Sequence, residues 1–123
     1  MTWKFSSDRP VYLQIMDQLR GAVLSGDYVP GGKIPSVREL ASAARVNPNT
    51  VQHALQELEH EGLLSAHGTN GRFVTEDPGI LEQARQRCLR ELTLECAAKF
   101  AALGISPGEA ARLMETLEEK EAL

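Results

Sequence analysis

The spacing of apolar residues predicts a helix near the start of the chain. From Pro10 to Gly26, apolar side chains recur every three or four residues, which is the period of one buried helix face. Proline suits the first turn of a helix, and glycine is a common residue just after the last turn. Upstream, Trp3 and Phe5 alternate with polar neighbours, and this short pattern predicts a strand.

Two further helices are indicated by the residues that begin them. Ser36 and Glu39 have the spacing of a capping box, so we expect a short second helix that stops near Arg45. Asn47 is a favoured capping residue, and Pro48 follows it at the first helical position, where its missing N–H costs nothing. A third helix therefore begins there and ends at the next glycine.

The third helix is amphipathic in an unusual way. Its apolar face carries Val51, Ala54, Leu55 and Leu58. Its opposite face carries Asn49, His53 and Gln56, flanked by Thr50 and Gln52. That outer face is polar but uncharged, whereas charged side chains are the usual cover of a solvated helix. Amides and hydroxyls donate and accept hydrogen bonds, so this face could read the edges of bases.

A β-hairpin and a helical tail follow. Residues 63–66 and 73–75 flank a glycine-bounded tip, and a turn at 77–79 separates them from a long helical pattern over 80–103. The apolar stripe of that pattern contains Leu81, Ala84, Cys88, Leu92, Cys96, Phe100 and Leu103. After Gly104, a capping-box sequence at 106–109 begins a last helix, expected to bury Ala110, Leu113, Met114 and Leu117.

Length and charge narrow the class of protein. The chain has 123 residues and a net charge of -4, from 13 basic and 17 acidic residues. Residues 1–75 carry seven of each sign, so the excess of acids belongs to residues 76–123. The length fits one small domain with a helical appendage. No apolar run is long enough to span a membrane and the start is unlike a signal peptide, so we expect a soluble cytoplasmic protein.

Metal, redox and catalytic functions are not indicated. His53 and His60 would lie roughly 10 Å apart along one helix, too far to share a metal ion. Cys88 and Cys96 are roughly 12 Å apart along another helix, too far to bridge, and are expected to be reduced, buried thiols. The sequence contains no recognisable nucleophile, acid–base pair or phosphate loop, so we expect neither enzyme activity, nor a metal site, nor a cofactor.

The order of these elements resembles a known family. The segments PVYLQIMDQLRGAVLSGDYVPGGKIPSVRELA and VNPNTVQHALQELEHEGLL, followed by a hairpin ending in GRFV, resemble the winged-helix domain of the GntR family of bacterial transcription regulators. The Asn-Pro-Asn-Thr opening of the third helix and the short two-helix tail are most similar to the YtrA-type subfamily. The wing differs, since it has one more residue between its glycines and an arginine where relatives have threonine.

The resemblance implies a DNA-binding surface. It places Ser36 and Arg38 of the second helix, Asn47, Asn49, Thr50 and Gln52 of the recognition helix, and Gly71 and Arg72 of the wing against DNA. Arg45 in the turn and His53 on the outer face are added from their positions alone. Each arginine could equally be an ordinary solvated charge.

Together these patterns predict a mainly α-helical chain with a small β-hairpin wing. A winged helix-turn-helix domain would occupy residues 1–77, and a two-helix dimerisation region residues 78–123. The predicted dimer contacts are Leu81, Cys88, Leu92, Cys96, Phe100, Leu103, Leu113 and Leu117. The expected function is a homodimeric repressor on a palindromic double-stranded operator, with any small-molecule effector in a crevice between subunits or between domain and tail. The alternative is a winged helix that binds another protein instead of DNA.

Overall fold

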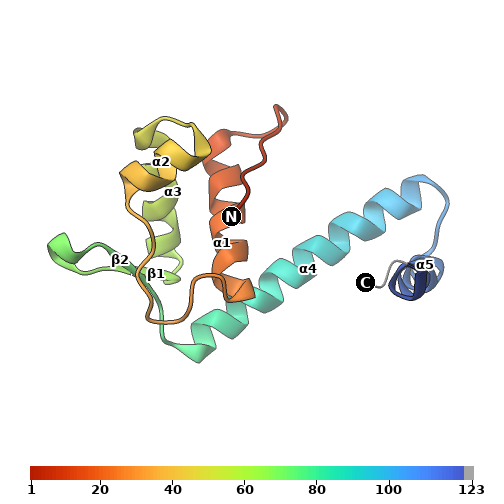
Figure 1. Ribbon diagram of the computed structural model, residues 1–123. Helices are drawn as coiled ribbons and strands as arrows, with labels where there is room; N and C mark the ends of the chain where they lie inside the picture. Colours follow the sequence, from red (N-terminus) through yellow and green to blue (C-terminus); the bar gives the residue numbers. More distant parts are fainter. Residues whose placement is uncertain (121–123) are drawn as a thin grey trace. The chain divides into compact units, whose positions relative to one another are not determined.

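The computed structural model describes residues 1–120, with side chains as far as residue 118. Its elements are α1 (Val11–Ser25), α2 (Val37–Ala44), α3 (Pro48–His60), β1 (Leu64–Ala66), β2 (Arg72–Val74), α4 (Pro78–Ala102) and α5 (Pro107–Lys120), as Figure 1 shows. The chain divides into two compact units, of which the first is Met1–Ala84 and the second begins at Arg85. The last three residues of the predicted 78–123 region lie outside the described residues.

The first unit has a single apolar core. Helix α1 packs along α3, and α2 packs on α3 as well. The innermost side chains are Ile15, Leu19, Val51, Leu55, Leu58, Leu63 and Val74, each less than 2% exposed. They come from α1, α3 and the hairpin, so the predicted helical stripes are confirmed. No described helix combines the length and the apolar character needed to cross a bilayer.

The predicted helix boundaries around the turn are also confirmed. The Ser36 hydroxyl oxygen accepts from the Glu39 N–H at 3.1 Å, and the Glu39 carboxylate accepts from the Ser36 N–H at 3.0 Å. The side chain of Asn47 caps α3 by accepting from the Asn49 N–H at 2.8 Å. These bonds satisfy backbone donors that the first turn of a helix leaves unpaired. The turn between α2 and α3 is therefore defined on both sides by local sequence.

The hairpin is a two-stranded antiparallel sheet in which Ser65 pairs with Phe73. A single 3-10 turn, Gly68–Asn70, forms its tip. The loop before α2 lies along the free edge of β2, where Ile34 N–H donates to the Arg72 carbonyl at 3.0 Å and Lys33 forms a β-bridge with Phe73. The hairpin thus has a third extended segment beside it and projects from the helices as a wing (Figure 1).

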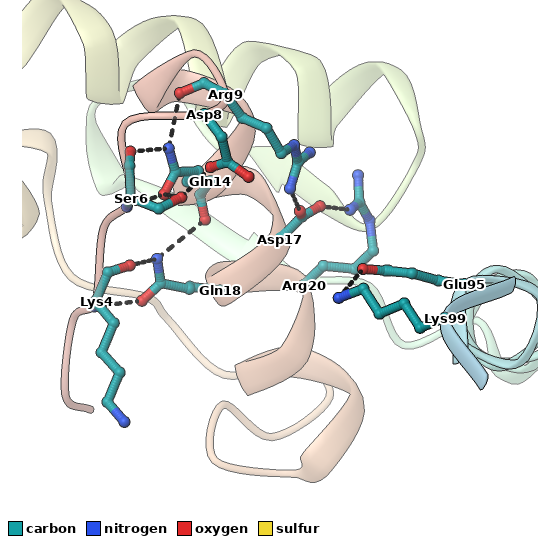
Figure 2. Close-up of polar contacts among 10 residues, drawn as sticks. All are labelled: Lys4, Ser6, Asp8, Arg9, Gln14, Asp17, Gln18, Arg20, Glu95 and Lys99. Carbon is teal, nitrogen blue, oxygen red and sulfur yellow. Dashed lines mark hydrogen bonds and ion pairs between the residues drawn. The ribbon is translucent and has the colours of Figure 1, made fainter. Parts of the chain in front are cut away.

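The strand predicted at Trp3 and Phe5 is wrong. The segment is extended, but no strand lies beside it in the described chain, and its hydrogen-bond partners are side chains of α1. Gln18 pairs with the N–H and C=O of Lys4, at 3.0 and 2.8 Å. Gln14 pairs in the same way with Ser6, at 2.8 and 2.9 Å (Figure 2). Two glutamine amides therefore supply the pairing that a neighbouring strand would give.

The second unit contains the rest of α4 and all of α5. The apolar stripe of α4 is only partly covered, since Phe100 is half-buried while Leu92 is exposed. Ala110 is buried, but Leu113, Met114 and Leu117 are 48%, 50% and 58% exposed, so a single chain does not bury these three side chains. Cys88 and Cys96 form no disulfide among the described residues, and they are half-buried rather than buried. The helical period was predicted correctly, but it does not say which surface covers the stripe.

Candidate nucleic-acid interface

The outer face of α3 is accessible. Asn49 and His53 are exposed and Gln52 is half-buried, and the side chain of Asn49 has no hydrogen-bond partner among the described residues. Residues four apart lie on the same side of a helix, so Asn49 and His53 are neighbours there. Asn47 uses its side-chain oxygen to cap the helix, which leaves its NH₂ group as a donor. The polar face predicted from the sequence is present and open.

The start of α2 presents both a hydroxyl and a cation. Arg38 is exposed and has no ion pair among the described residues. The Ser36 oxygen accepts from the Glu39 N–H, and the same hydroxyl faces the Glu39 carboxylate. Hydrogen bonds from the backbone and side chain of Ser36 hold the pKa of the Glu39 carboxyl below its ordinary value of 4.5, aided by nearby Lys33. Arg38 is therefore the group at this helix end that suits an anion.

Arg45 occupies the turn between α2 and α3 in a left-handed backbone conformation, with φ 58° and ψ 48°. It is the one non-glycine residue with positive φ among those described. Such a conformation costs a side-chain-bearing residue roughly 1–2 kcal/mol. The N–H of Arg45 ends α2 by donating to the Ala41 carbonyl, and its side chain is exposed. A glycine would fit this backbone better, so the arginine is not explained by folding.

A small cleft of about 220 Å³ separates the wing from the start of α2. Its lining includes Lys33, Ser36, Thr69, Gly71 and Arg72. Gly71 has φ 97°, and a Cβ built on it would lie 2.9 Å from Lys33 Cε. A glycine at this position therefore leaves room for the lysine side chain. Arg72 donates from Nε to the Glu59 carboxylate, and its side chain is 17% exposed. The side chain of Lys33, beside the wing, is therefore more available to a ligand than that of Arg72.

Lys33 and Thr69 were not singled out by sequence reasoning. Lys33 follows two glycines and precedes the cap of α2, so a basic residue beside a helix start was the available signal. Its place in the cleft depends on the bridge to Phe73, which joins residues 40 positions apart. Thr69 carried no signal beyond its position in the glycine-bounded tip.

Ion pairs explain how residues 1–75, with seven bases and seven acids, can present a basic face. Three of its arginines are neutralised by carboxylates: Arg9 by Asp17, Arg20 by Asp17 and Glu61, and Arg72 by Glu59. Asp17 lies between the first two guanidinium groups in Figure 2. Lys33, Arg38 and Arg45 have no ion pair among the described residues and lie around the turn and the wing. The carboxylates that pair with these three arginines thus leave the bases around the turn uncompensated, and Glu39 is the acid that lies near Lys33.

The structure offers no metal site among the residues it describes, since no three potential ligands cluster there. His53 and His60 both lie near Glu57, at 3.9 and 3.8 Å, as ordinary surface neighbours on one helix.

The first unit has three helices around one core, a tight turn before a helix with an exposed polar face, and a wing beside that turn. This arrangement defines a winged helix-turn-helix DNA-binding domain. Comparison with known proteins identifies the family. Residues 11–74 match the family model described as bacterial regulatory proteins, gntR family. The chain therefore belongs to the GntR family; it is a DNA-binding transcription regulator and not an enzyme.

Individual relatives agree with this assignment. The HTH-type transcriptional repressor YtrA of Bacillus subtilis is 44% identical over 71 residues, which are 58% of this chain and 55% of that protein. A GntR family transcriptional regulator from Listeria monocytogenes has a similar structure, with a TM-score of 0.83 and 31% identity over 91% of this chain and 98% of that one. The DNA-binding domain of AraR in complex with operator ORX1 is similar over 61% of this chain and 92% of that one, with a TM-score of 0.54 and 28% identity. The resemblance to the YtrA-like subfamily is confirmed.

Proposed function

We propose that this regulator is a homodimer that represses transcription by binding a palindromic operator. The observation that carries the dimer is the exposure of four leucines on α4, just after it and on α5: Leu92, Leu103, Leu113 and Leu117, at 57%, 79%, 48% and 58%. Large apolar side chains gathered on one short segment are typical of a protein interface. A second copy related by a twofold axis would cover them, and a twofold protein matches a palindromic site.

The proposed DNA contacts come from four places in the first unit. Ser36 and Arg38 of α2, Arg45 of the turn and Arg72 of the wing would meet phosphates, with Gly71 allowing close approach. Asn47, Asn49, Thr50, Gln52 and His53 would approach the major groove from α3. Asn49 and Gln52 are the candidates for base readout, because an amide pairs bidentately with adenine. Lys33 joins the phosphate-binding group on the evidence of the cleft.

Repression is supported by similar proteins, since the curated relatives YtrA and NagR of Bacillus subtilis are both named transcriptional repressors. A DNA reader of this kind would act on the bacterial chromosome, in the cytoplasm. An effector has one candidate place in the second unit, an open apolar groove of about 310 Å³ between α4 and α5 that is lined by Phe100 and Met114. A protein-binding role remains the alternative to operator binding.

The operator can be obtained by selecting from duplexes randomised over a span of two half-sites. We expect a palindrome with half-site centres roughly 10 base pairs apart, or a multiple of that, bound by one dimer. Asn49→Ala should relax discrimination at one symmetric pair of positions while the preference elsewhere persists. A uniform loss over all sequences would instead assign Asn49 to the DNA backbone.

Salt dependence tests the phosphate contacts separately. Each phosphate neutralised contributes roughly -0.9 to the slope of log affinity against log salt. Arg38→Ala should flatten that slope by roughly two units in the dimer, one from each subunit. If the intact protein selects no duplex and shows no salt-dependent DNA binding, the protein-binding alternative replaces this proposal.

A further inference from the structure

Tyr12 of α1 lies flat against His53 of α3. Their ring centroids are 4.0 Å apart and the ring planes differ by 17°. Tyr12 is half-buried at the start of α1, whereas the side chain of His53 is 51% exposed. One face of the imidazole is therefore covered, and its remaining surface is open to the solvent on the polar side of α3.

Tyr12 is the contact that fixes this ring. Glu57 also lies near it, but its Oε1 is 3.9 Å from His53 Nε2, beyond hydrogen-bond distance. Stacked aromatic pairs contribute attraction beyond simple burial, and ring centroids at this separation are in close contact. A histidine on an open helix face otherwise samples several rotamers, and ordering it on binding would reduce affinity.

We propose that Tyr12 is a positioning residue for sequence readout, and that it holds His53 for a contact to a base. The inference rests on the DNA-binding function above and adds a base-reading residue and its support to it. His53 lies one helical turn beyond Asn49 on the same face, so both side chains can reach consecutive positions along one groove. Tyr12 itself belongs to a different helix and acts through the imidazole.

The chemistry indicates what His53 reads. A neutral imidazole carries one N–H donor and one acceptor nitrogen. Purines present N7 as an acceptor in the major groove, and guanine adds O6. A fixed imidazole N–H therefore favours a purine at one position of each half-site, next to the position read by Asn49.

The test measures base preference with three single variants and one double variant of the full chain. Tyr12→Leu removes the ring, Tyr12→Phe keeps it as a matched control, and His53→Ala removes the reader. Each protein is assayed on the selected operator and on duplexes altered at single positions. We expect Tyr12→Leu and His53→Ala each to reduce discrimination about tenfold at the same purine. Tyr12→Phe should retain it, and the Tyr12→Leu/His53→Ala double variant should lose no more than either single change.

The outcomes separate this inference from the proposed function. If the unaltered protein selects no operator, DNA recognition itself fails. If it selects one and Tyr12→Leu keeps full discrimination, or weakens all duplexes equally, only the positioning role is overturned. Urea unfolding of each variant gives a second readout, because a purely structural role would lower stability and leave the base preference unchanged.

Discussion

Arg20 on α1 makes a two-pronged ion pair with Glu61, the residue that follows α3. Nη2 lies 2.6 Å from Oε2 and Nε lies 3.1 Å from Oε1, and the two side chains are 17% and 23% exposed. Asp17 receives a further bond from Arg20 at 3.0 Å. This pair joins the first and third helices at a distance from the turn, so Glu61 does not oppose DNA binding there.

Removing Arg20 should therefore affect stability rather than recognition. Arg20→Met keeps the apolar stem but leaves Glu61 without its guanidinium partner, and we expect a loss of about 1–2 kcal/mol in unfolding free energy. Urea unfolding measures this loss. Arg9→Met is the matched control, since Arg9 pairs with Asp17 on an exposed surface and should change stability by less than about 0.5 kcal/mol. Equal losses in both variants would contradict the argument.

Gln14 should hold the N-terminal segment locally. The residue is 7% exposed, and its side chain bonds twice to the Ser6 backbone and to the Arg9 carbonyl at 2.7 Å. In Gln14→Met the N–H of Ser6 loses its acceptor, so hydrogen exchange at that amide should speed up while the core amides stay protected. Gln18→Met is the control and should expose the Lys4 amide instead. Unchanged exchange at Ser6 in Gln14→Met would show that the segment is held by other contacts.

The features that the sequence predicted well are those that depend on residues close together in the chain. The capping box of Ser36 and Glu39 and the Asn47–Pro48 start of α3 act within one helical turn, so local chemistry was enough to place the recognition helix. The polar face of α3 follows from the same helical period. The fold class and the main candidate surface could therefore be predicted from the order of residues alone.

The features that were missed depend on contacts between distant residues. The extended segment at Trp3 pairs with glutamine side chains 8 and 14 residues further on, not with a strand. Lys33 enters the wing cleft because the loop before α2 lines up along β2. Likewise, Tyr12 of one helix stacks on His53 of another. The apolar period of each helix does not show how the two helices are rotated relative to each other, so this contact could not be predicted.

Glu39 should make stability depend on pH in the acid range. Its pKa is lower in the folded protein, chiefly because the backbone N–H and the side chain of Ser36 bond to the carboxylate. A lowered folded pKa means that the stabilisation is full above the unfolded value and is lost as the pH falls through the folded value. Glu39→Gln should therefore show a shallower decline in unfolding free energy from about pH 5 to about pH 3. Identical pH profiles for the two proteins would contradict this assignment.

Arg45 allows stability and DNA binding to be separated. Arg45→Gly relieves the left-handed backbone, and we expect a gain of about 0.5–1 kcal/mol in unfolding free energy. Arg45→Ala removes the same charge but keeps the strained backbone, so it should not gain. Both variants should flatten the salt dependence of operator binding equally, by roughly two units in a dimer. A variant pair that binds like the unaltered protein would show that Arg45 is a solvated charge.

Leu92 and Leu94 provide a matched test of the proposed dimer surface. Both are 57% exposed on α4, so a simple measure of exposure does not distinguish them. At about 100° per residue they point to nearly opposite sides of the helix. Leu92 lies on the predicted stripe and lines the groove shared with α5, whereas Leu94 does neither.

A charge at Leu92 should therefore disrupt the dimer, and the same charge at Leu94 should not. Leu92→Glu would place an unpaired carboxylate inside an apolar interface, which is costly unless the subunits separate. Sedimentation at micromolar concentration should then give a monomer for Leu92→Glu and a dimer for Leu94→Glu. Joining two DNA-binding domains strengthens binding by about 10² to 10⁴, so the operator affinity of the monomeric Leu92→Glu variant should fall by a similar factor. The affinity of the dimeric Leu94→Glu variant should not fall. A dimeric Leu92→Glu protein, or a monomeric unaltered protein, would place the subunit contact elsewhere or remove it.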